Sequence, residues 1–358
     1  MAGSGTVLRT ISSLGYNGIG VDIDPLAVLM SSAWTSPVNK VGFLRKVDQV
    51  LKGVDDLGEN CVDLPWIDQC EDTQNFISFW FAKRQISELR KLSFIVANNQ
   101  GKYVNLLKVA LSKLIITKSK GASLAADVSH SRPHKMREFN DFEVISEYKK
   151  ACERIAKIMI DTPPKGKIKM TLGDARKLKI KTNTVDAIIT SPPYLNAIDY
   201  MRGHKLALVW LGHKINDLSL IRGTSVGAEK APEESANIKL AKKIVSKIKG
   251  LDRLPNRKIN MIHRYALDMY EIIRESSRVL KRNGRATFVI GNTTQEGVYI
   301  ENTSIASEAA KSFGLELIDF REREIPQNRR YLPPPTSKEL SGLKKRMRTE
   351  AVMTFIKS

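Results

Sequence analysis

The stretch that decides the fold is V-D-A-I-I-T-S-P-P-Y, residues 185–194. Its first part is a short apolar run with β-branched residues, which predicts a buried parallel strand over residues 185–190. Pro192 and Pro193 must end that strand, because a proline supplies no N–H to the ladder and fixes its own φ. Ligands bind at the carboxyl ends of strands in open α/β sheets, so we expect residues 191–194 to lie in a binding site.

The loop at residues 191–194 has the chemistry to hold a flat ring that carries an amino group. Its carbonyls stand in a stiff turn, where they can accept hydrogen bonds from an exocyclic NH2 group. The ring of Tyr194 can stack on the attached base. A proline-rich turn with a packing tyrosine is the alternative interpretation of the same four residues.

The composition indicates a basic globular chain. It has 358 residues, 58 Lys and Arg against 38 Asp and Glu, a formal charge of +20 and 42% hydrophobic residues. This length allows one large domain with insertions or two domains. The charge favours a polyanionic partner, with nucleic acid the leading candidate.

Several other classes of protein are disfavoured. No apolar run is long enough to span a bilayer, and the amino terminus lacks the basic and apolar regions of a secretion signal, so we expect no membrane contact. The three cysteines are too few and too scattered for a disulfide framework or a zinc site. We therefore expect a reducing, cytoplasmic location and no metal.

A second motif lies at the start of the chain. Residues 1–6 are rich in glycine and lead into a helical pattern at residues 7–14, and residues 19–23 predict a buried strand that is followed by Asp24 and includes Asp22. A glycine turn, a helix and a strand ending in acid make up most of a nucleotide-binding βαβ unit. In such a unit the glycines let the backbone approach the ligand, and the acid accepts from ribose hydroxyls.

The first strand of that unit is absent from the sequence. It would normally lie in the middle of the sheet, between the strands that end at Asp24 and Thr190, so its absence predicts a gap with two unpaired sheet edges. Three explanations stay open. An upstream piece is cut off or mis-called, another chain supplies the strand, or the protein is a remnant.

The pattern changes after the second strand. Residues 75–92 and 145–160 show the spacing of amphipathic helices, so residues 35–164 are expected to form a helical insertion and a possible target-recognition region. The strand pattern resumes at residues 168–172. Asp174 follows as a second acid at a strand end.

The carboxyl-terminal part completes an α/β pattern. The Lys- and Glu-rich segment 216–258 is predicted to be a charged flexible insertion or an exposed helix pair. The remaining predicted elements are helices at 205–211, 263–280 and 305–313, a buried strand at 286–290, and two antiparallel edge strands at 315–320 and 351–356.

Taken in order, A-G-S-G-T, G-V-D-I-D-P, L-G-D-A-R and T-S-P-P-Y resemble the motifs of S-adenosylmethionine-dependent DNA amino-methyltransferases. A Ser before the prolines is similar to the cytosine-N(4) class, whereas Asn or Asp there favours adenine-N(6) enzymes. The resemblance covers residues 1–34 and 165–358 and implies an α/β fold with a Rossmann-like methyltransferase sheet. The family's first motif opens with a strand and an Asp-Pro-aromatic step, and only the half at residues 2–6 is present here.

The resemblance also implies a role for each matching residue. The cofactor S-adenosylmethionine would lie against the glycine loop, which comprises Ala2, Gly3, Gly5 and Thr6. Asp22 would accept from the ribose, Ile23 would pack on the adenine ring and Asp174 would accept from the adenine amino group. The catalytic loop would comprise Ser191, Pro192, Pro193 and Tyr194, with the target amino nitrogen held by Ser191 and the carbonyl of Pro192. A base inside a duplex must be flipped out to reach such a loop, and transfer is then an in-line displacement that depends on positioning.

Candidate nucleic-acid-binding residues complete the predicted site. Arg329, Arg330 and Tyr331 could grip a phosphate or the flipped nucleotide, or form a solvated basic loop. The candidate pocket-wall residues after the proline motif are Asp199, Tyr200 and Arg202. The predicted function is DNA methylation in restriction–modification or phage defence, with a cognate restriction endonuclease as a candidate partner. Methylation of adenine in DNA or of a base in structured RNA stays open, as does a truncated or split chain that only binds nucleic acid.

Overall fold

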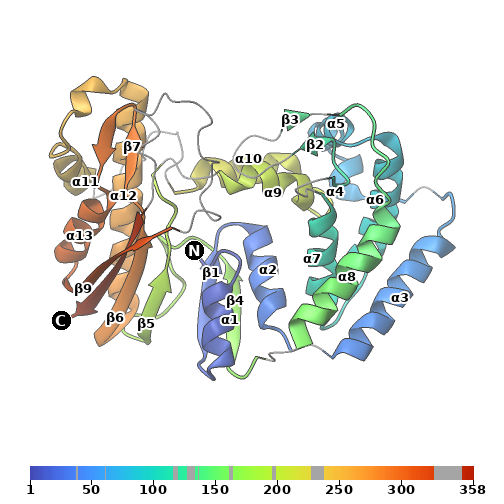
Figure 1. Ribbon diagram of the computed structural model, residues 1–358, viewed down its shortest axis with the longest axis horizontal. Coiled ribbons are helices and arrows are strands. Elements are labelled where there is room, and N and C mark those ends of the chain that lie inside the picture. The colour runs from blue at the N-terminus through green and yellow to red at the C-terminus, as the bar shows by residue number, and fades with distance from the viewer. Residues whose placement is uncertain are drawn as a thin grey trace. The chain divides into compact units, whose positions relative to one another are not determined.

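The computed structural model of the chain divides into two compact units (Figure 1). Unit 1 comprises Met1, Gly173–Ile198 and Gly223–Ser358, and unit 2 comprises Ala2–Leu172 and Asp199–Arg222. Each unit has a hydrophobic core of its own. The described residues are 1–37, 39–60, 62–115, 120–126, 134–135, 137–160, 164–195, 199–226, 238–325 and 349–358.

Unit 2 begins with the predicted nucleotide-binding pattern. Helix α1 (Thr6–Ser13) leads into β1 (Gly18–Asp22), and α2 (Pro25–Thr35) follows directly. β1 pairs in parallel with β4 (Ile168–Leu172), in a register that sets Gly18 opposite Ile168. The predicted helix at 7–14 and the strands at 19–23 and 168–172 are confirmed to within one residue.

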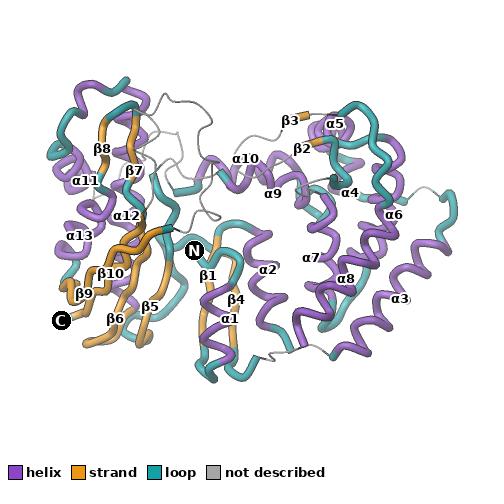
Figure 2. The backbone as a smooth tube through the Cα atoms, viewed as in Figure 1, coloured by secondary structure: helices purple, strands orange, loops and turns teal. Residues whose placement is uncertain are grey.

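The rest of unit 2 is mainly helical (Figure 2). Its further elements are α3 (Lys40–Asp56), α4 (Pro65–Asp68), α5 (Glu71–Trp80), α6 (Lys83–Ala97), α7 (Val104–Ile115), β2 (Ala125–Ala126), β3 (His134–Lys135) and α8 (Val144–Ile160). The helix predicted at 145–160 is confirmed. The single helix predicted at 75–92 is wrong, because Phe81 takes an extended conformation between α5 and α6. The Phe81 ring is 2% exposed and packs edge-on against Trp210, with 5.1 Å between ring centroids, and this core contact outweighs the helical pattern.

Two helices that follow the proline motif contribute to unit 2. These are α9 (Tyr200–Leu208) and most of α10 (Ile215–Thr224). Leu206 and Trp210 are at most 1% exposed, and Trp66 Nε1 donates to the Val209 carbonyl at 2.8 Å. α9 begins and ends earlier than the helix predicted at 205–211. The compact units also cut across the expected functional division at residues 34 and 165, because the insertion and the βαβ pattern share one core.

Unit 1 contains a four-stranded sheet in the order β5 (Val185–Thr190), β6 (Leu280–Ile290), β10 (Thr349–Lys357) and β9 (Leu315–Glu324). β5 is parallel to β6, as its apolar pattern predicted, and β10 is antiparallel to both β6 and β9. The prediction that both carboxyl-terminal strands are edge strands is wrong for β10. β10 pairs with both β6 and β9, so it lies inside the sheet, and of the two carboxyl-terminal strands β9 is the edge strand among the described residues. The alternate β10 residues Ala351, Met353 and Phe355 are buried.

Helices α11 (Ile238–Val245), α12 (Asn256–Val279) and α13 (Asn302–Ser312) pack with this sheet in the core of unit 1. Short elements η1 (Leu251–Arg253), β7 (Thr293–Gln295) and β8 (Val298–Ile300) join them. α12 begins before the predicted residue 263 and leads straight into β6. Within the segment 216–258, Ala241 and Val245 are buried, and residues 227–237 lie outside the described ones. None of the helices described is long and apolar enough to cross a membrane.

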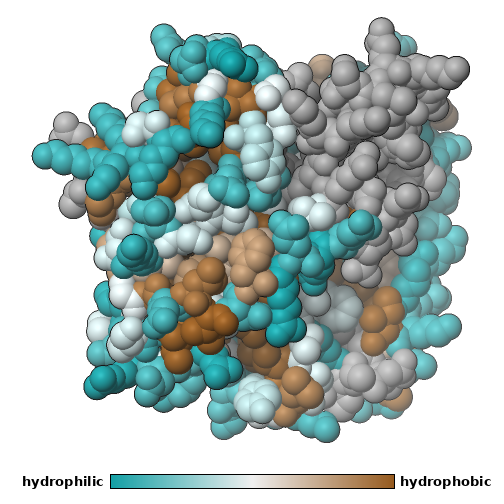
Figure 3. Space-filling model, turned by 60° about the vertical axis from the view of Figure 1, so that its left-hand side comes forward, coloured by the Kyte–Doolittle hydropathy of each residue, from teal (hydrophilic) through white to brown (hydrophobic). Residues whose placement is uncertain are grey.

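Three strands are more exposed than their apolar sequences predict. Ile19 of β1, Ile189 of β5 and Leu172 of β4 are 52%, 52% and 55% exposed. β1 and β5 each pair with one strand only among the residues described, so apolar positions typical of inner strands reach the surface. Apolar residues are visible on the surface in Figure 3, and the exposed large ones among the described residues of unit 1 are Ile189, Leu240, Tyr299, Leu317, Ile318 and Phe320.

Candidate active site

The glycine loop of unit 2 is held against the end of β1. Gly3 and Gly5 have φ values of +55° and +84°, a region that L side chains rarely adopt. A Cβ on Gly5 would lie 2.7 Å from the Cα of Ser31, so α2 also leaves no room for a side chain there. Ser31 Oγ donates to the Gly3 carbonyl at 2.9 Å. The loop thus presents bare backbone at the carboxyl end of a parallel strand.

The acids after β1 fix that backbone. Asp22 accepts from Gly3 N–H at 2.9 Å and from Asp24 N–H at 3.0 Å, one bond on each carboxylate oxygen. Asp24 caps α2 by accepting from Leu26 N–H at 2.8 Å. Ala2 N–H donates to the Val21 carbonyl at 3.1 Å, so the start of the loop runs beside β1. Six of the predicted cofactor residues, Ala2, Gly3, Gly5, Thr6, Asp22 and Ile23, therefore lie in one part of unit 2.

Asp174, the seventh predicted cofactor residue, lies in unit 1 and is paired with its neighbour Arg176. The carboxylate accepts from Arg176 Nη2 at 2.7 Å and from Arg176 N–H at 2.8 Å. Burial alone would raise the pKa of Asp174, but the hydrogen bonds from Arg176 outweigh it and lower the pKa. Asp174 is thus an ionised acceptor near neutral pH, and a ligand amino group would share it with Arg176.

Arg176 is itself anchored on α12. Its Nη1 donates to Asp268 Oδ1 at 2.6 Å, and the two side chains are 13% and 3% exposed. Its Nη2 also donates to the Thr224 carbonyl at 2.6 Å. The L-G-D-A-R motif contains Arg176, yet sequence reasoning missed its role, because the buried partner Asp268 is distant in the chain.

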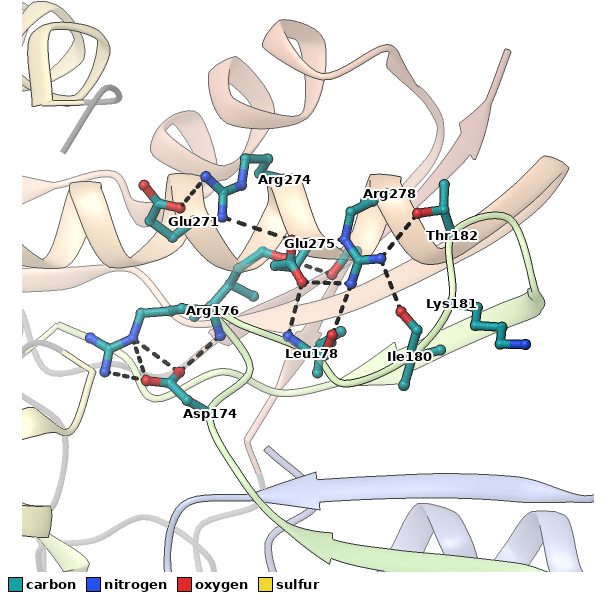
Figure 4. A network of polar contacts seen from close by, with 12 residues as sticks. Asp174, Arg176, Leu178, Ile180, Lys181, Thr182, Glu271, Arg274, Glu275 and Arg278 are labelled. Carbon is teal, nitrogen blue, oxygen red and sulfur yellow. Dashed lines mark hydrogen bonds and ion pairs between the residues drawn. The ribbon is translucent and has the colours of Figure 1, made fainter.

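The segment after Asp174 lies along α12 through a row of polar contacts (Figure 4). Leu178 N–H donates to Glu275 Oε2 at 2.9 Å. Arg278 donates to the carbonyls of Leu178 and Ile180, both at 2.9 Å, and to Thr182 Oγ1 at 3.1 Å. These bonds fix a segment without regular secondary structure, and with it the position of Asp174.

The proline motif follows β5 in unit 1, as predicted. Ser191 is exposed, Pro192 is buried, and Pro193 and Tyr194 are half-buried. Ser191 Oγ donates to the Val289 carbonyl at 3.1 Å, and 3.2 Å separates it from the Tyr194 hydroxyl oxygen. The loop is therefore tied to β6, the neighbouring strand.

Tyr194 is held by a residue that sequence reasoning missed. Its hydroxyl donates to Glu350 Oε2 at 2.9 Å, and Glu350 pairs with Arg323 Nε at 2.7 Å. Burial, with a contribution from Glu350, raises the pKa of Tyr194 to about 12, so the phenol is neutral at physiological pH. No local pattern signals Glu350, because only the antiparallel pairing of β10 brings it to the proline motif.

Asp199, Tyr200 and Arg202 lie at the start of α9, in unit 2. Asp199 accepts from Arg202 Nε at 2.8 Å and from Arg222, and Tyr200 is 50% exposed. His204, one turn later and also missed from sequence, contacts Asp24. Arg329, Arg330 and Tyr331 lie outside the described residues.

Comparisons with known proteins show a distant similarity in sequence to methyltransferases. No family model matches the chain. It is 22% identical over 362 residues to the type II methyltransferase M.MvaI of Kocuria varians, covering 91% of this chain and 76% of that protein. It is 32% identical over 150 residues to the type II methyltransferase M.AvaI of Nostoc sp., covering 37% of this chain. That alignment spans about a third of the relative, 31% of its length.

Solved structures show only a weak likeness. A Thermus thermophilus protein provisionally described as a DNA modification methylase, solved with S-adenosyl-L-methionine, is 14% identical, with a TM-score of 0.27 over 52% of this chain and 51% of that one. The cyclase SpnF is also 14% identical, with a TM-score of 0.25 over 90% of this chain and 97% of that one. Because a methylase and a cyclase match about equally well, these likenesses carry no argument about activity.

Proposed function

We propose that this protein transfers a methyl group from S-adenosylmethionine to the exocyclic amino group of a flipped-out base in DNA, with cytosine N(4) as the target atom. The observation that carries the proposal is the similarity to M.MvaI over 91% of the chain, in a sequence that holds the four motifs in order. The local geometry of the two sets of motif residues also supports the proposal.

The residues of unit 2 fit the cofactor. Gly3 and Gly5 expose backbone in a conformation that disfavours a side chain, and each carboxylate oxygen of Asp22 can accept more than one hydrogen bond. In the proposed complex Gly3 and Gly5 lie against the methionine part, Asp22 accepts from the ribose and Ile23 packs on adenine. Asp174 accepts from the adenine amino group. S-adenosylmethionine supplies an electrophilic methyl group.

The residues of unit 1 fit the target base. Ser191 and the Pro192 carbonyl hold the amino nitrogen, and the anchoring of Tyr194 by Glu350 fixes its ring for stacking. An ordered loop of this kind lowers the barrier by orienting the nitrogen, since the reaction needs no covalent enzyme intermediate. Asp199, Tyr200, Arg202, Arg329, Arg330 and Tyr331 are the proposed contacts to the nucleotide and its phosphates.

The serine before the prolines favours cytosine over adenine, and the charge of +20 favours a nucleic acid as the substrate. Incubation with radiolabelled cofactor and DNA, followed by nucleoside analysis, tests the base. N(4)-methylcytosine is the expected product. N(6)-methyladenine would overturn the choice of base but would still support methyl transfer to an exocyclic amino group of DNA. We also propose a role in restriction–modification or phage defence, alongside a cognate endonuclease.

A second observation favours an additional strand. β5 is rich in apolar residues, yet it pairs only with β6 among the described residues, and Ile189 is 52% exposed. An exposed strand edge offers free N–H and C=O groups to another strand. We propose that a parallel apolar strand pairs with this edge, supplied by the same polypeptide or by another chain. Without it the chain would bind nucleic acid but not transfer a methyl group.

Calorimetric titration of the purified chain with S-adenosylmethionine tests both proposals. Micromolar binding that falls at least about tenfold in Asp22→Asn would support the cofactor site, since each lost tenfold equals about 1.4 kcal/mol. Asp186→Asn, whose side chain is 82% exposed, is the matched control and should bind normally. A folded wild-type chain that does not bind S-adenosylmethionine, but binds it after an apolar strand is added beside β5, would support the strand proposal. Failure in both forms would refute the proposed function.

A further inference from the structure

His204 joins two groups of candidate residues within unit 2. It lies on α9, one turn after Tyr200, and its Nδ1 forms a hydrogen bond with Oδ2 of Asp24. The His204 and Asp24 side chains are only 25% and 13% exposed, so water competes little for this bond. An Nδ1–H on the imidazole would donate to this carboxylate oxygen.

On one side, the bond continues into the glycine loop. The second oxygen of Asp24 caps α2 through Leu26 N–H, and the Asp24 N–H donates to Asp22. Asp22 in turn accepts from Gly3 N–H. His204, Asp24, Asp22 and Gly3 thus form one continuous series of hydrogen bonds that ends where the cofactor is proposed to bind.

On the other side, His204 is part of α9, whose first turn contains proposed nucleotide contacts. The ring centroids of Tyr200 and His204 are 6.0 Å apart, and Asp199 at the start of α9 accepts from Arg202. The later residues Leu206 and Trp210 are fixed in the core. A shift of the first turn of α9, where the proposed nucleotide contacts lie, would therefore move His204 and change its hydrogen bond to Asp24.

We propose that His204 is a positioning residue that couples cofactor binding to nucleic-acid binding. The inference rests on the proposed function, because it uses the cofactor and nucleotide contacts assigned there. Coupling between two binding sites is reciprocal, so the cofactor tightens DNA binding by the same factor by which DNA tightens cofactor binding. A histidine that only packed would affect stability and leave this factor unchanged.

The test measures DNA affinity with and without saturating S-adenosylhomocysteine, which lacks the methyl group and so prevents turnover. The probe is a fluorescein-labelled duplex of mixed sequence, followed by anisotropy. For the wild-type chain we expect S-adenosylhomocysteine to lower the Kd about fivefold or more, the lower end of typical couplings. His204→Ala should bring the ratio of the two Kd values to about one, because the link to Asp24 is lost.

Two amide variants separate the bond from the packing. The side-chain amide of His204→Asn reaches the place of Nδ1 and should restore most of the ratio. The side-chain amide of His204→Gln lies nearer the place of Nε2, so this variant should not restore the ratio. It replaces His204→Ala in the test if the alanine variant does not fold. Arg90→Ala is the matched control, because it removes a different polar contact of unit 2, the ion pair Arg90–Asp68, whose side chains are 19% and 32% exposed. Arg90→Ala should lower the free energy of unfolding and leave the ratio of the two Kd values at its wild-type value.

A wild-type ratio in folded His204→Ala or His204→Gln would overturn the inference. So would a ratio of one in a wild-type chain that methylates DNA, and in that case the proposed function would stand. A chain that binds neither ligand, both alone and with an added apolar strand beside β5, would overturn both proposals.

Discussion

Tyr194 combines a polar anchor with a stacking surface in one side chain. Its hydroxyl donates to Glu350, which Arg323 pairs from the neighbouring strand β9. Since burial raises the pKa of this phenol to about 12, the hydroxyl keeps its proton and the anchor persists at physiological pH. The ring is thereby held in place before a base arrives, which reduces the entropy lost on binding.

Replacement of Tyr194 tests its proposed role. Tyr194→Ala should lower the rate of methyl transfer by a factor that corresponds to about 1–3 kcal/mol, the usual value of one base stack, while cofactor affinity stays unchanged. Tyr194→Phe keeps the ring and loses the bond to Glu350, so it should retain most of the rate. Steady-state kinetics and calorimetry measure the two quantities. Wild-type turnover in the alanine variant would remove Tyr194 from the site.

At the level of elements, the segment 174–182 depends on α12 for its order. It contains no helix or strand, and the Leu178 N–H and the carbonyls of Leu178 and Ile180 bond to the side chains of Glu275 and Arg278 (Figure 4). Arg278 alone satisfies two carbonyls of the segment. Side chains of α12 therefore supply hydrogen bonds to the backbone of this segment, as a neighbouring strand does in a sheet. Asp174 is the first residue of the segment.

Arg278→Ala tests this dependence. The free energy of unfolding should fall by about 1 kcal/mol, because two carbonyls lose their partner while water can reach a site whose side chain is 32% exposed. Hydrogen exchange of the Leu178 amide should also become faster. Arg274→Ala, on the same helix but bonded only to Glu271 and Glu275 among the contacts in Figure 4, should change stability by less than about 0.5 kcal/mol. Equal losses in a urea titration would contradict the assignment.

For the whole molecule, the net charge acts over longer distances than individual contacts do. A formal charge of +20 attracts any polyanion, so affinity for DNA should depend steeply on salt. If about four phosphates are neutralised, a fourfold rise in salt should weaken binding more than about a hundredfold. Fluorescence anisotropy at several salt concentrations gives this slope. A slope near zero would mean that the positive charge does not contact the DNA backbone.

The local sequence pattern was enough to predict most of the helices and strands and to place the motifs along the chain. The alternation of apolar and polar residues and the positions of glycine and proline depend only on neighbours in the chain, which is why β1, β4, β5 and α8 were predictable. Where a core contact competes with a local pattern, as at Phe81, prediction failed. The inner place of β10 was also unpredictable, because pairing between strands is decided by packing and not by the strand's own sequence.

The sequence by itself determined the chemistry that the chain can offer: a glycine loop followed by an acid, a proline turn followed by a tyrosine, and a large positive charge. Only the tertiary structure decided which partners hold those groups. Glu350 reaches Tyr194 across 156 residues, Asp268 reaches Arg176 across 92, and His204 reaches Asp24 across 180. Such pairs form because the packing of distant elements brings them together, and no local spacing encodes that.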